Sequence, residues 1–296
     1  MKNIAIYENT DKAEAVKYAC RAAEILVNLG VECIVQPSLE PHLPNHITGS
    51  VTISRVCDFD KIADVVISFG GDGTLLTAAR EMLMCDVPIM GFNVGKLGFL
   101  AEYSVEKIEE NIAAVINGNF RLVDRAVIET TFKGITHYAL NDFVLEKRNS
   151  SQMINVAVYS NEHCVGDYRA DGIVLTTPTG STAYSLSCSG PIIAPSAKVL
   201  CITPISPHTL TLRPLVIPDT NEVTFGVTYA GGEAILVADG ITLSEIKTGD
   251  IIKFKLSDER VKLIKPQDSS YYDILRNKLL WGANSLDEET HKRSLN

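Results

Sequence analysis

The chain has 296 residues, of which 46% are hydrophobic and 21% are charged. At roughly 150 residues per domain, this length predicts two domains, each able to bury its own core, and excludes a disordered chain or a small disulfide scaffold. A formal net charge of −9 disfavours binding to nucleic acid or to anionic lipid surfaces.

The cysteines and the apolar runs predict a soluble cytoplasmic protein without a membrane segment. None of the seven cysteines stands at the Cys-x-x-Cys spacing of a metal site, which indicates reduced thiols. The apolar run at the N-terminus is too short for a signal peptide. No stretch approaches the ~18 to 20 continuous apolar residues that a spanning helix needs.

The first 120 residues alternate predicted strands and helices. Short apolar runs predict strands at 3–7, 31–35, 63–69 and 87–92, and helical spacing of apolar residues predicts helices at 11–29, 74–83 and 104–116. Residues 37–57 contain three prolines and no periodicity, which predicts a loop. The order strand, helix, strand predicts an α/β domain over residues 1–120, with a parallel sheet and flanking helices.

After residue 120 the pattern changes to short runs of β-branched and aromatic residues. The clearest predicted strands are 127–132, 153–159, 223–229, 234–237 and 251–256, with turns at Asn161-Glu162 and Gly231-Gly232. This predicts an all-β domain of sandwich or barrel type over residues 121–265. Residues 266–296 contain a predicted helix at 271–280, expected to pack back on the first domain, and a polar end from residue 285 that is expected to fray.

A glycine-rich turn, Gly70-Gly71-Asp72-Gly73-Thr74, lies between a predicted buried strand and an amphipathic helix. Glycines allow the backbone to approach a ligand closely, and the N-terminus of the helix favours a phosphate. A carboxylate beside a phosphate is unfavourable unless it binds a metal or accepts a proton, so Asp72 is a candidate general base for a hydroxyl nucleophile. The alternative is a tight turn in which Asp72 only caps the helix.

Other phosphate and metal motifs are absent from the sequence. The Gly-x-Gly-x-x-Gly pattern does not follow the strand, Gly95-Lys96 lacks the remainder of a Walker loop, and no His-Glu-x-x-His occurs. His42 and His46 have helical spacing, but Pro44 lies between them. The sequence therefore predicts no metal site made by the protein.

Two further segments are candidates for ligand contact. Residues 93–100 carry two glycines that frame Lys96 and Leu97, which predicts a loop over the first site, and Phe99 could stack on a base or fill the core. Residues 176–187 present many hydroxyl groups, which suit ribose hydroxyls and base edges, and Tyr184 could stack. A structural loop is the alternative for this segment, and Asp239-Gly240 is interpreted as a turn at the end of a strand.

Taken together, these motifs resemble those of the bacterial NAD kinase family. The match includes Gly70–Thr74, Asn141-Asp142, residues 177–187, residues 93–100 and residues 213–216. The resemblance extends over residues 4–266, and the combination is more specific than the first motif, which lipid kinases and phosphofructokinases share. Cys188-Ser189-Gly190-Pro191 departs from the family's Gly-Gly-Pro, so Cys188 is either an oxidant-sensitive thiol or a buried inert one.

The resemblance implies transfer of the γ-phosphoryl group of ATP to the 2′-hydroxyl of the adenosine ribose of NAD. Asp72 would be the base, and Gly70, Gly71, Gly73 and Thr74 would form the phosphate loop. Contacts with NAD would come from Asp72, Gly73, Phe99, Asn141, Asp142, Arg169, Asp171, Thr182, Ala183, Tyr184, Ser185, Leu186 and Ser187. Arg169 and Asp171 would reach the second half of the dinucleotide, either in the same subunit or from a neighbouring one.

The same resemblance implies a homodimer or homotetramer, and Mg²⁺ or another divalent cation carried by the nucleotide. Two other functions remain open at this point. One is a related kinase for a lipid or a sugar phosphate, although the acidic chain offers no obvious membrane-facing patch. The other is a non-catalytic NAD-binding regulator, which would gain nothing from Asp72.

Overall fold

The computed structural model describes residues 1–95, 98–148 and 151–280, which form two compact units. Of the described residues, unit 1 comprises those in 1–78, 87–123 and 263–280, and unit 2 comprises those in 79–86 and 124–262. The expected fraying from residue 285 lies outside the described residues, as do Lys96 and Leu97. Among the described residues, no helix is long and apolar enough to span a membrane.

Unit 1 is an α/β layer structure built on a parallel sheet. Its strands lie in the order β3-β2-β1-β4-β5, and the last residues of β18 pair in parallel with β5. The bounds are β1 Asn3–Glu8, β2 Glu32–Val35, β3 Val51–Ile53, β4 Val65–Gly70, β5 Ile89–Asn93 and β6 Tyr103–Ser104. The central strands β1, β4 and β5 are almost fully buried, as their uninterrupted apolar runs predict.

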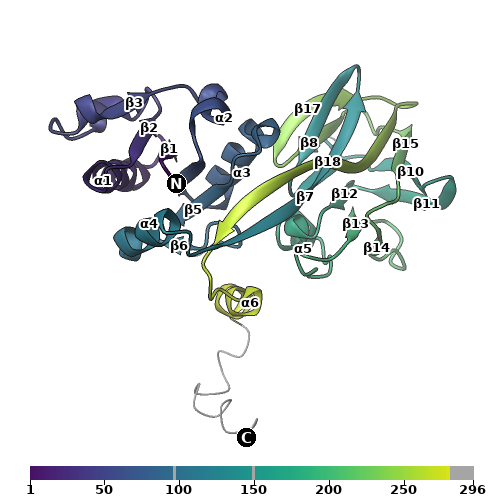
Figure 1. Ribbon diagram of the computed structural model, residues 1–296. Coiled ribbons are helices and arrows are strands. Elements are labelled where there is room, and N and C mark those ends of the chain that lie inside the picture. The colour runs from purple at the N-terminus through teal and green to yellow at the C-terminus, as the bar shows by residue number, and fades with distance from the viewer. Residues whose placement is uncertain (96–97, 149–150, 281–296) are drawn as a thin grey trace, which may run out of the picture. The chain divides into compact units, whose positions relative to one another are not determined.

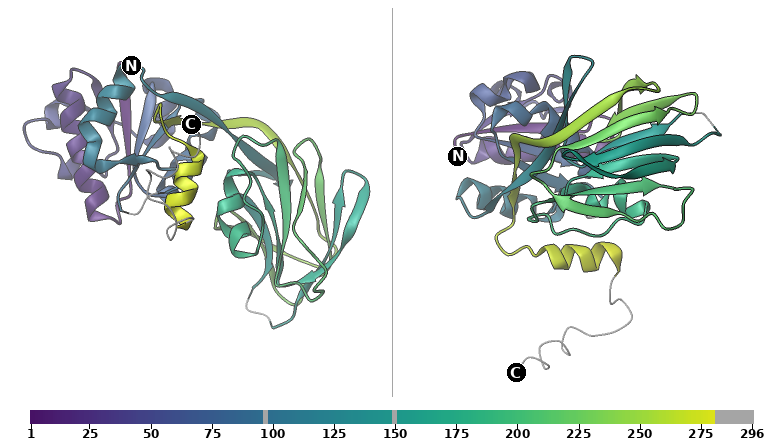
Figure 2. Two further views of the ribbon diagram at one scale, coloured as in Figure 1. Left: turned by 90° about the horizontal axis from the view of Figure 1, so that it is seen from below. Right: turned by 90° about the vertical axis from the view of Figure 1, so that its right-hand side faces the viewer.

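Helices cover both faces of this sheet. Helices α1 (Ala13–Asn28) and α4 (Ile108–Ile116) contact each other and share one hydrophobic core with β1, β2, β4 and β5 (Figure 1 and Figure 2). Helix α3 (Asp72–Glu81) packs on the other face, where Leu75 lies against Gly91. Short helix α2 (Phe59–Ile62) precedes β4, and C-terminal helix α6 (Tyr271–Leu279) belongs to unit 1 and buries Ile274 and Leu275.

The predicted loop at 37–57 needs one correction, because it contains the strand β3 as well as two 3-10 turns. The residues of β3 are partly or fully exposed at the edge of the sheet. An edge strand needs no continuous apolar run, and this one follows three prolines, so neither periodicity nor hydrophobicity could reveal it.

Unit 2 is a β sandwich. One sheet has the order β11-β10-β15-β18-β7-β8 and the other has the order β14-β13-β12-β9-β16-β17, with antiparallel pairing throughout the second sheet. Side chains from both sheets form one hydrophobic core, in which Phe143, Phe225 and Phe254 stack edge to face or at a tilt.

The predicted strands 153–159, 223–229 and 234–237 agree closely with β10, β15 and β16, whereas the connecting strands β7 and β18 are longer than the sequence predicts. The strand bounds are β7 Arg121–Phe132, β8 Ile135–Ala139, β9 Asp142–Lys147, β10 Ile154–Ser160, β11 His163–Ala170, β12 Gly172–Thr176, β13 Val199–Ile205, β14 Leu215–Pro218, β15 Val223–Tyr229, β16 Ala234–Ala238, β17 Ile241–Ile246 and β18 Ile251–Lys265. The single turn of helix α5 spans Tyr184–Ser187. The chain passes from unit 1 to unit 2 along β7 and returns along β18.

Candidate active site

The glycine-rich turn joins the end of β4 to the start of α3, as the sequence predicts. A Cβ atom on Gly70 would lie 2.1 Å from Thr74 Oγ1, so a side chain at this position would displace Thr74. Thr74 Oγ1 in turn accepts a hydrogen bond from Asn9 Nδ2 at 3.3 Å. The absence of a side chain at Gly70 thus allows α3 to begin directly after the end of the strand, with Asp72 as its first residue.

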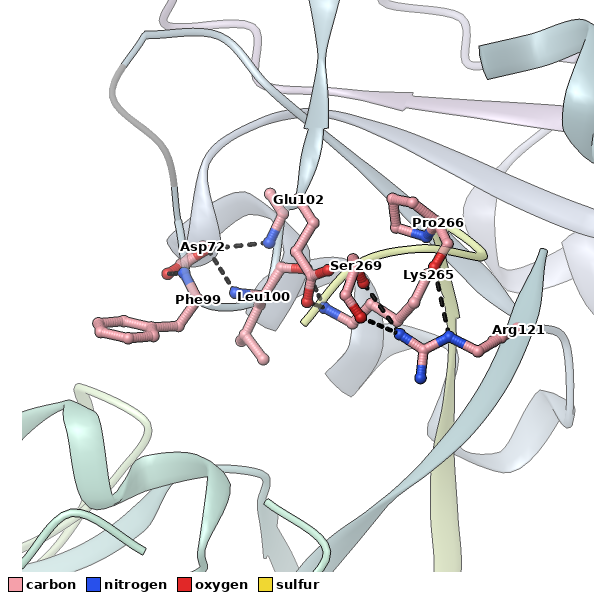
Figure 3. Close-up of polar contacts among 9 residues, drawn as sticks. Asp72, Phe99, Leu100, Glu102, Arg121, Lys265, Pro266 and Ser269 are labelled. Atoms are coloured by element: carbon pink, nitrogen blue, oxygen red, sulfur yellow. Dashed lines mark hydrogen bonds and ion pairs between the residues drawn. The ribbon is translucent and has the colours of Figure 1, made fainter. Parts of the chain in front are cut away.

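The carboxylate of Asp72 is held by the backbone of a neighbouring loop. Phe99 N donates to Oδ2 at 2.7 Å, and Leu100 N and Ala101 N each donate to Oδ1 at 3.0 Å (Figure 3). A Cβ atom on Gly98 would lie 1.9 Å from Asp72 Oδ1, so glycine is required for this close approach. The loop predicted to cover the first site therefore contacts Asp72 through its described residues.

A polar cavity of about 360 Å³ lies beside this turn, within unit 1. Its walls come from the end of β1, the start of α1 and the first turns of α3: Tyr7, Glu8, Asn9, Thr10, Asp11, Lys12, Gly71, Gly73, Thr74 and Thr77. Burial raises the pKa of Glu8, whose carboxylate accepts hydrogen bonds from Ser38 Oγ and Gln36 Nε2. The glycine backbone, the hydroxyl groups and Lys12 in this cavity suit phosphate oxygens, whereas the carboxylates of Glu8 and Asp11 in the same wall do not.

In unit 2, the Asn141-Asp142 pair lies in a turn that is fixed from two sides. Asp239 accepts peptide hydrogen bonds from Leu140, Asn141 and Asp142, at 2.8, 2.7 and 3.1 Å. On the other side, Asn141 O accepts hydrogen bonds from Thr176 Oγ1 and Thr177 N.

This role of Asp239 differs from the simple turn that the sequence predicts. Asp239-Gly240 does form a turn, with both residues at positive φ, but the aspartate also orients the segment that carries the candidate NAD contacts. One signal was present in the sequence, because Ala-Asp-Gly-Ile occurs at 170–173 and again at 238–241. The first copy contains the candidate residue Asp171.

Asp142 is buried, with 4% of its surface exposed. Burial, together with the charges of Asp239 and Glu146, raises the pKa of its carboxyl group to about 7. Tyr184 lies close to the same charges: its hydroxyl group donates to Glu146 Oε2 at 3.4 Å, and burial with Glu146 raises its pKa to about 12. Asp142 and Tyr184 thus lie near the same carboxylate, that of Glu146.

The hydroxyl-rich segment is used differently from the way the sequence suggests. Thr177 Oγ1 donates to Leu140 O at 2.6 Å, Ser181 Oγ donates to Pro178 O, and Ser185 Oγ is bonded to Thr203 Oγ1. These side chains are fully buried, so their hydroxyl groups shape the loop. Tyr184 is 39% exposed and Ser187 is also exposed, while Thr182, Ala183 and Leu186 are partly buried.

Arg169 and Asp171 flank the end of β11. Asp171 forms an ion pair with Lys147 at 2.6 Å. Exposed Arg169 lines a cavity of about 690 Å³ with Ser151, Gln152, Met153, Asn155, His208 and Tyr229. The structure therefore provides a polar, partly cationic surface at this end of unit 2.

Cys188 is a poor candidate for an oxidant-sensitive thiol. Burial raises its pKa, and the nearby carboxylates of Asp142 and Glu146 raise it further. Since the thiolate is the reactive form, both effects reduce its reactivity. All seven cysteines are free thiols in the structure.

The described residues do not form a metal-binding cage. No cluster of three or more His, Cys, Asp or Glu side chains within residues 1–95, 98–148 and 151–280 could hold an ion.

Comparison with known proteins matches both units. The ATP-NAD kinase N-terminal domain model matches residues 4–120, and the ATP-NAD kinase C-terminal domain model matches residues 140–266. The NAD kinase of Geobacter metallireducens is 36% identical over 95% of this chain and 99% of its own length, and that of Bacteroides fragilis is 37% identical over 95% and 98%.

Solved structures agree with this match. Yeast NADH kinase complexed with NADH aligns over 97% of this chain and 89% of its own, with a TM-score of 0.85 and 25% identity. An NAD kinase from Archaeoglobus fulgidus in complex with ATP has the same fold, with a TM-score of 0.72 at 24% identity over 95% of this chain and 98% of its own. From the two domain matches and the identity to full-length bacterial relatives, the chain belongs to the ATP-NAD kinase family.

Proposed function

We propose that this chain transfers the γ-phosphoryl group of ATP to the 2′-hydroxyl of the adenosine ribose of NAD, with Asp72 as the general base. The observation that carries this proposal is the hydrogen-bonding state of the Asp72 carboxylate. A carboxylate has about four lone-pair positions. Oδ1 accepts two peptide N–H groups and Oδ2 accepts one, so Oδ2 keeps a position for the substrate hydroxyl.

In the proposed reaction, Asp72 Oδ2 accepts the proton of the 2′-hydroxyl as its oxygen attacks the γ-phosphorus, and ADP leaves. The peptide N–H groups of residues 99–101 fix the carboxylate before the substrate arrives, so no reorganisation is needed during the step. Mg²⁺ or another divalent cation, bound to the triphosphate, neutralises charge on the transferred group.

The triphosphate is assigned to the cavity beside Gly71 and Gly73. The N-terminus of α3 and Lys12 favour an anion there, and the cavity adjoins the turn that carries Asp72. The adenosine of NAD is assigned to Asn141, Asp142 and the segment Thr182 to Ser187. The exposed ring of Tyr184 provides a surface on which a base can stack.

Arg169 and Asp171 are assigned to the second half of NAD, reached from a neighbouring subunit of a homodimer or homotetramer. The cavity lined by Arg169 and His208 supports this assignment, since a dinucleotide carries two phosphates. We further place the protein in the cytoplasm, where its seven free thiols remain reduced.

Membership of the family leaves a lipid or sugar-phosphate kinase without support. A non-catalytic regulator would bind NAD without consuming ATP, and it would not need the fixed carboxylate. The test is formation of NADP from NAD, ATP and Mg²⁺, with NADH as a second acceptor and polyphosphate as a second donor. Binding of NAD without an ATP-dependent phosphorylated product would contradict the proposed function.

A further inference from the structure

A buried ammonium group lies behind the loop that holds Asp72. Lys265 is the last residue of β18, and its side chain is 3% exposed. Its Nζ atom forms an ion pair with Glu102 Oε1 at 2.6 Å and donates a hydrogen bond to Leu100 O at 2.6 Å (Figure 3). A buried cation is unfavourable unless it is paired with a charge and hydrogen-bonded. These two contacts meet both requirements for the Lys265 ammonium group.

The hydrogen bond to Leu100 O acts on the peptide group that contacts Asp72. Leu100 C=O and Ala101 N–H belong to one peptide unit, which is planar and trans, so its oxygen and its hydrogen point in opposite directions. Lys265 holds the oxygen, and Asp72 Oδ1 accepts the hydrogen at an N···O distance of 3.0 Å. A cation on the oxygen also polarises the amide and strengthens the bond that its N–H donates.

Lys265 is itself firmly anchored. Before it, Leu263 and Ile264 pair with Ile89 and Met90 of β5. After it, the guanidinium of Arg121 donates to Pro266 O at 3.3 Å and to Ser269 O at 2.6 Å. The ammonium group is thus attached to the rigid sheet of unit 1, whereas the loop that it holds is irregular backbone.

We propose that Lys265, with its charge balanced by Glu102, is a positioning residue for the phosphoryl transfer. It fixes the peptide unit 100–101 and thereby the orientation of the Asp72 carboxylate. This proposal rests on the proposed role of Asp72 as general base. In this ion pair, Glu102 Oε2 is buried without a hydrogen-bond partner among the described residues, and such an unsatisfied oxygen lowers the stability of the fold. Because a buried ion pair often adds little net stability, we assign the Lys265–Glu102 pair to the orientation of the peptide unit 100–101.

The experiment compares Lys265→Met with Lys262→Met in the full-length protein. Both changes remove an ammonium group from β18 and keep an unbranched apolar side chain, but Lys262 pairs with exposed Asp86 instead. We expect Lys265→Met to lower kcat by about 10- to 100-fold, because small misplacement of a catalytic group has effects of this size. KM for ATP and NAD should stay within about twofold, and Lys262→Met should match the wild type.

A second readout does not depend on activity. Amide hydrogen exchange at Leu100 and Ala101 should become faster in Lys265→Met and not in Lys262→Met, because the peptide unit loses its anchor. If Lys265→Met does not fold, Glu102→Gln replaces it, and we expect the same pattern with a smaller loss of kcat. Unchanged kcat and unchanged exchange in the folded variant would overturn the proposal.

A double-mutant cycle with Asp72→Asn separates this proposal from the one on which it rests. If Lys265 acts through Asp72, Lys265→Met should lower the residual kcat of Asp72→Asn by less than about twofold. A full additional loss would mean that Lys265 acts on the reaction by another route. If Asp72→Asn alone keeps normal kcat, the general-base proposal fails. If Asp72→Asn is inactive and Lys265→Met is normal, only the positioning proposal fails.

Discussion

Asp72 is the residue on which the proposed chemistry depends. We expect Asp72→Asn to lower kcat by about 10² to 10⁴, or roughly 3 to 5 kcal/mol of barrier, because an amide cannot take the ribose proton. NAD affinity should remain close to that of the wild type. The measurement combines steady-state kcat with equilibrium binding of NAD.

The melting temperature provides the control for this variant. The amide side chain of Asp72→Asn would still accept hydrogen bonds on its oxygen but would lose one of the three peptide donors, so a modest decrease is expected. If Asp72 only caps α3, asparagine would serve nearly as well, and kcat would barely change. Near-normal kcat in the folded variant would rule out the general base.

Substitution of Gly98 tests whether activity depends on the close approach of the loop to Asp72. In Gly98→Ala the new Cβ atom would lie 1.9 Å from Asp72 Oδ1, so residues 98–101 must move away from the carboxylate. We expect kcat to fall by about tenfold or more. Gly49→Ala is a matched control in unit 1, because a Cβ atom there meets nothing within 4 Å. Equal activity of the two variants would contradict the importance of the contact.

The raised pKa of Asp142 predicts that the stability of the protein depends on pH. Its pKa is about 7 in the folded protein, raised by burial, Asp239 and Glu146, against an ordinary value of 3.8. Between about pH 4 and about pH 7, the folded state therefore holds a proton that the unfolded state has released. The contribution of Asp142 to the free energy of unfolding falls as pH rises through this range. The expected slope approaches about 1.4 kcal/mol per pH unit within this window.

Other groups titrate in the same range, so the useful quantity is the difference between the wild type and Asp142→Asn. Free energies of unfolding should be measured by denaturant titration at several pH values between about 4 and 8. The stability of the wild type relative to the variant should decrease with rising pH. A difference that stays constant with pH would show that Asp142 titrates normally.

At the scale of elements, the sequence predicts the buried strands of unit 1 well and misses its exposed edge strand β3. The runs around β1, β4 and β5 are apolar on both faces, so hydrophobicity alone reveals them. For β18 the sequence predicts only residues 251–256, but the strand continues to Lys265. Burial alternates along the first residues of β18 and becomes continuous at its end, where the strand pairs with β5. The middle of the strand is polar, so its sequence does not indicate that the strand continues.

The candidate site shows the same limit of local patterns. The chemistry of a short segment makes Asp72 a candidate base, and the family resemblance makes Asn141-Asp142 candidate NAD contacts. Local patterns do not identify Asp239 or Lys265, since each acts on residues about 100 or more positions away. They also assign the hydroxyl groups of the segment 176–187 to the ligand, although the fold uses those of Thr177, Ser181 and Ser185 to close a buried loop.

The turn at residues 140–142 is an element that depends on Asp239. Asp239→Asn replaces one acceptor oxygen with a donor that opposes a peptide N–H, which should destabilise the fold by about 1 to 3 kcal/mol. Asn141 and Asp142 would lose their fixed positions, so we expect KM for NAD to rise more than KM for ATP. The pKa of Asp142 should also fall, because the Asp239 charge that raises it is gone.

Kinetics for both substrates and a carboxyl titration of Asp142 by NMR check these outcomes. Asp219→Asn in the same unit, a partly exposed aspartate outside the proposed site, is the control. An Asp239→Asn protein with normal KM for NAD would limit Asp239 to a simple turn.

The whole molecule is interleaved, since unit 1 is completed by residues that follow unit 2 in the chain. A polypeptide of residues 1–123 would contain the first predicted domain but would lack the end of β18 and α6. Leu263, Ile264, Ile274 and Leu275 are all nearly fully buried. At about 1.5 to 3 kcal/mol for each apolar side chain, their loss costs roughly 6 to 12 kcal/mol.

That loss is comparable to the whole stability of a typical domain, about 5 to 15 kcal/mol, and it also leaves Glu102 buried without Lys265. We therefore expect residues 1–123 alone to lack a cooperative thermal transition in far-UV circular dichroism. A polypeptide in which a short Gly-Ser linker joins residues 1–123 to 263–280 should regain that transition. The linker is feasible because β7 pairs with β18 and Arg121 reaches Pro266. Cooperative melting of residues 1–123 at the same temperature as the joined polypeptide would show that the C-terminal segment is dispensable for unit 1.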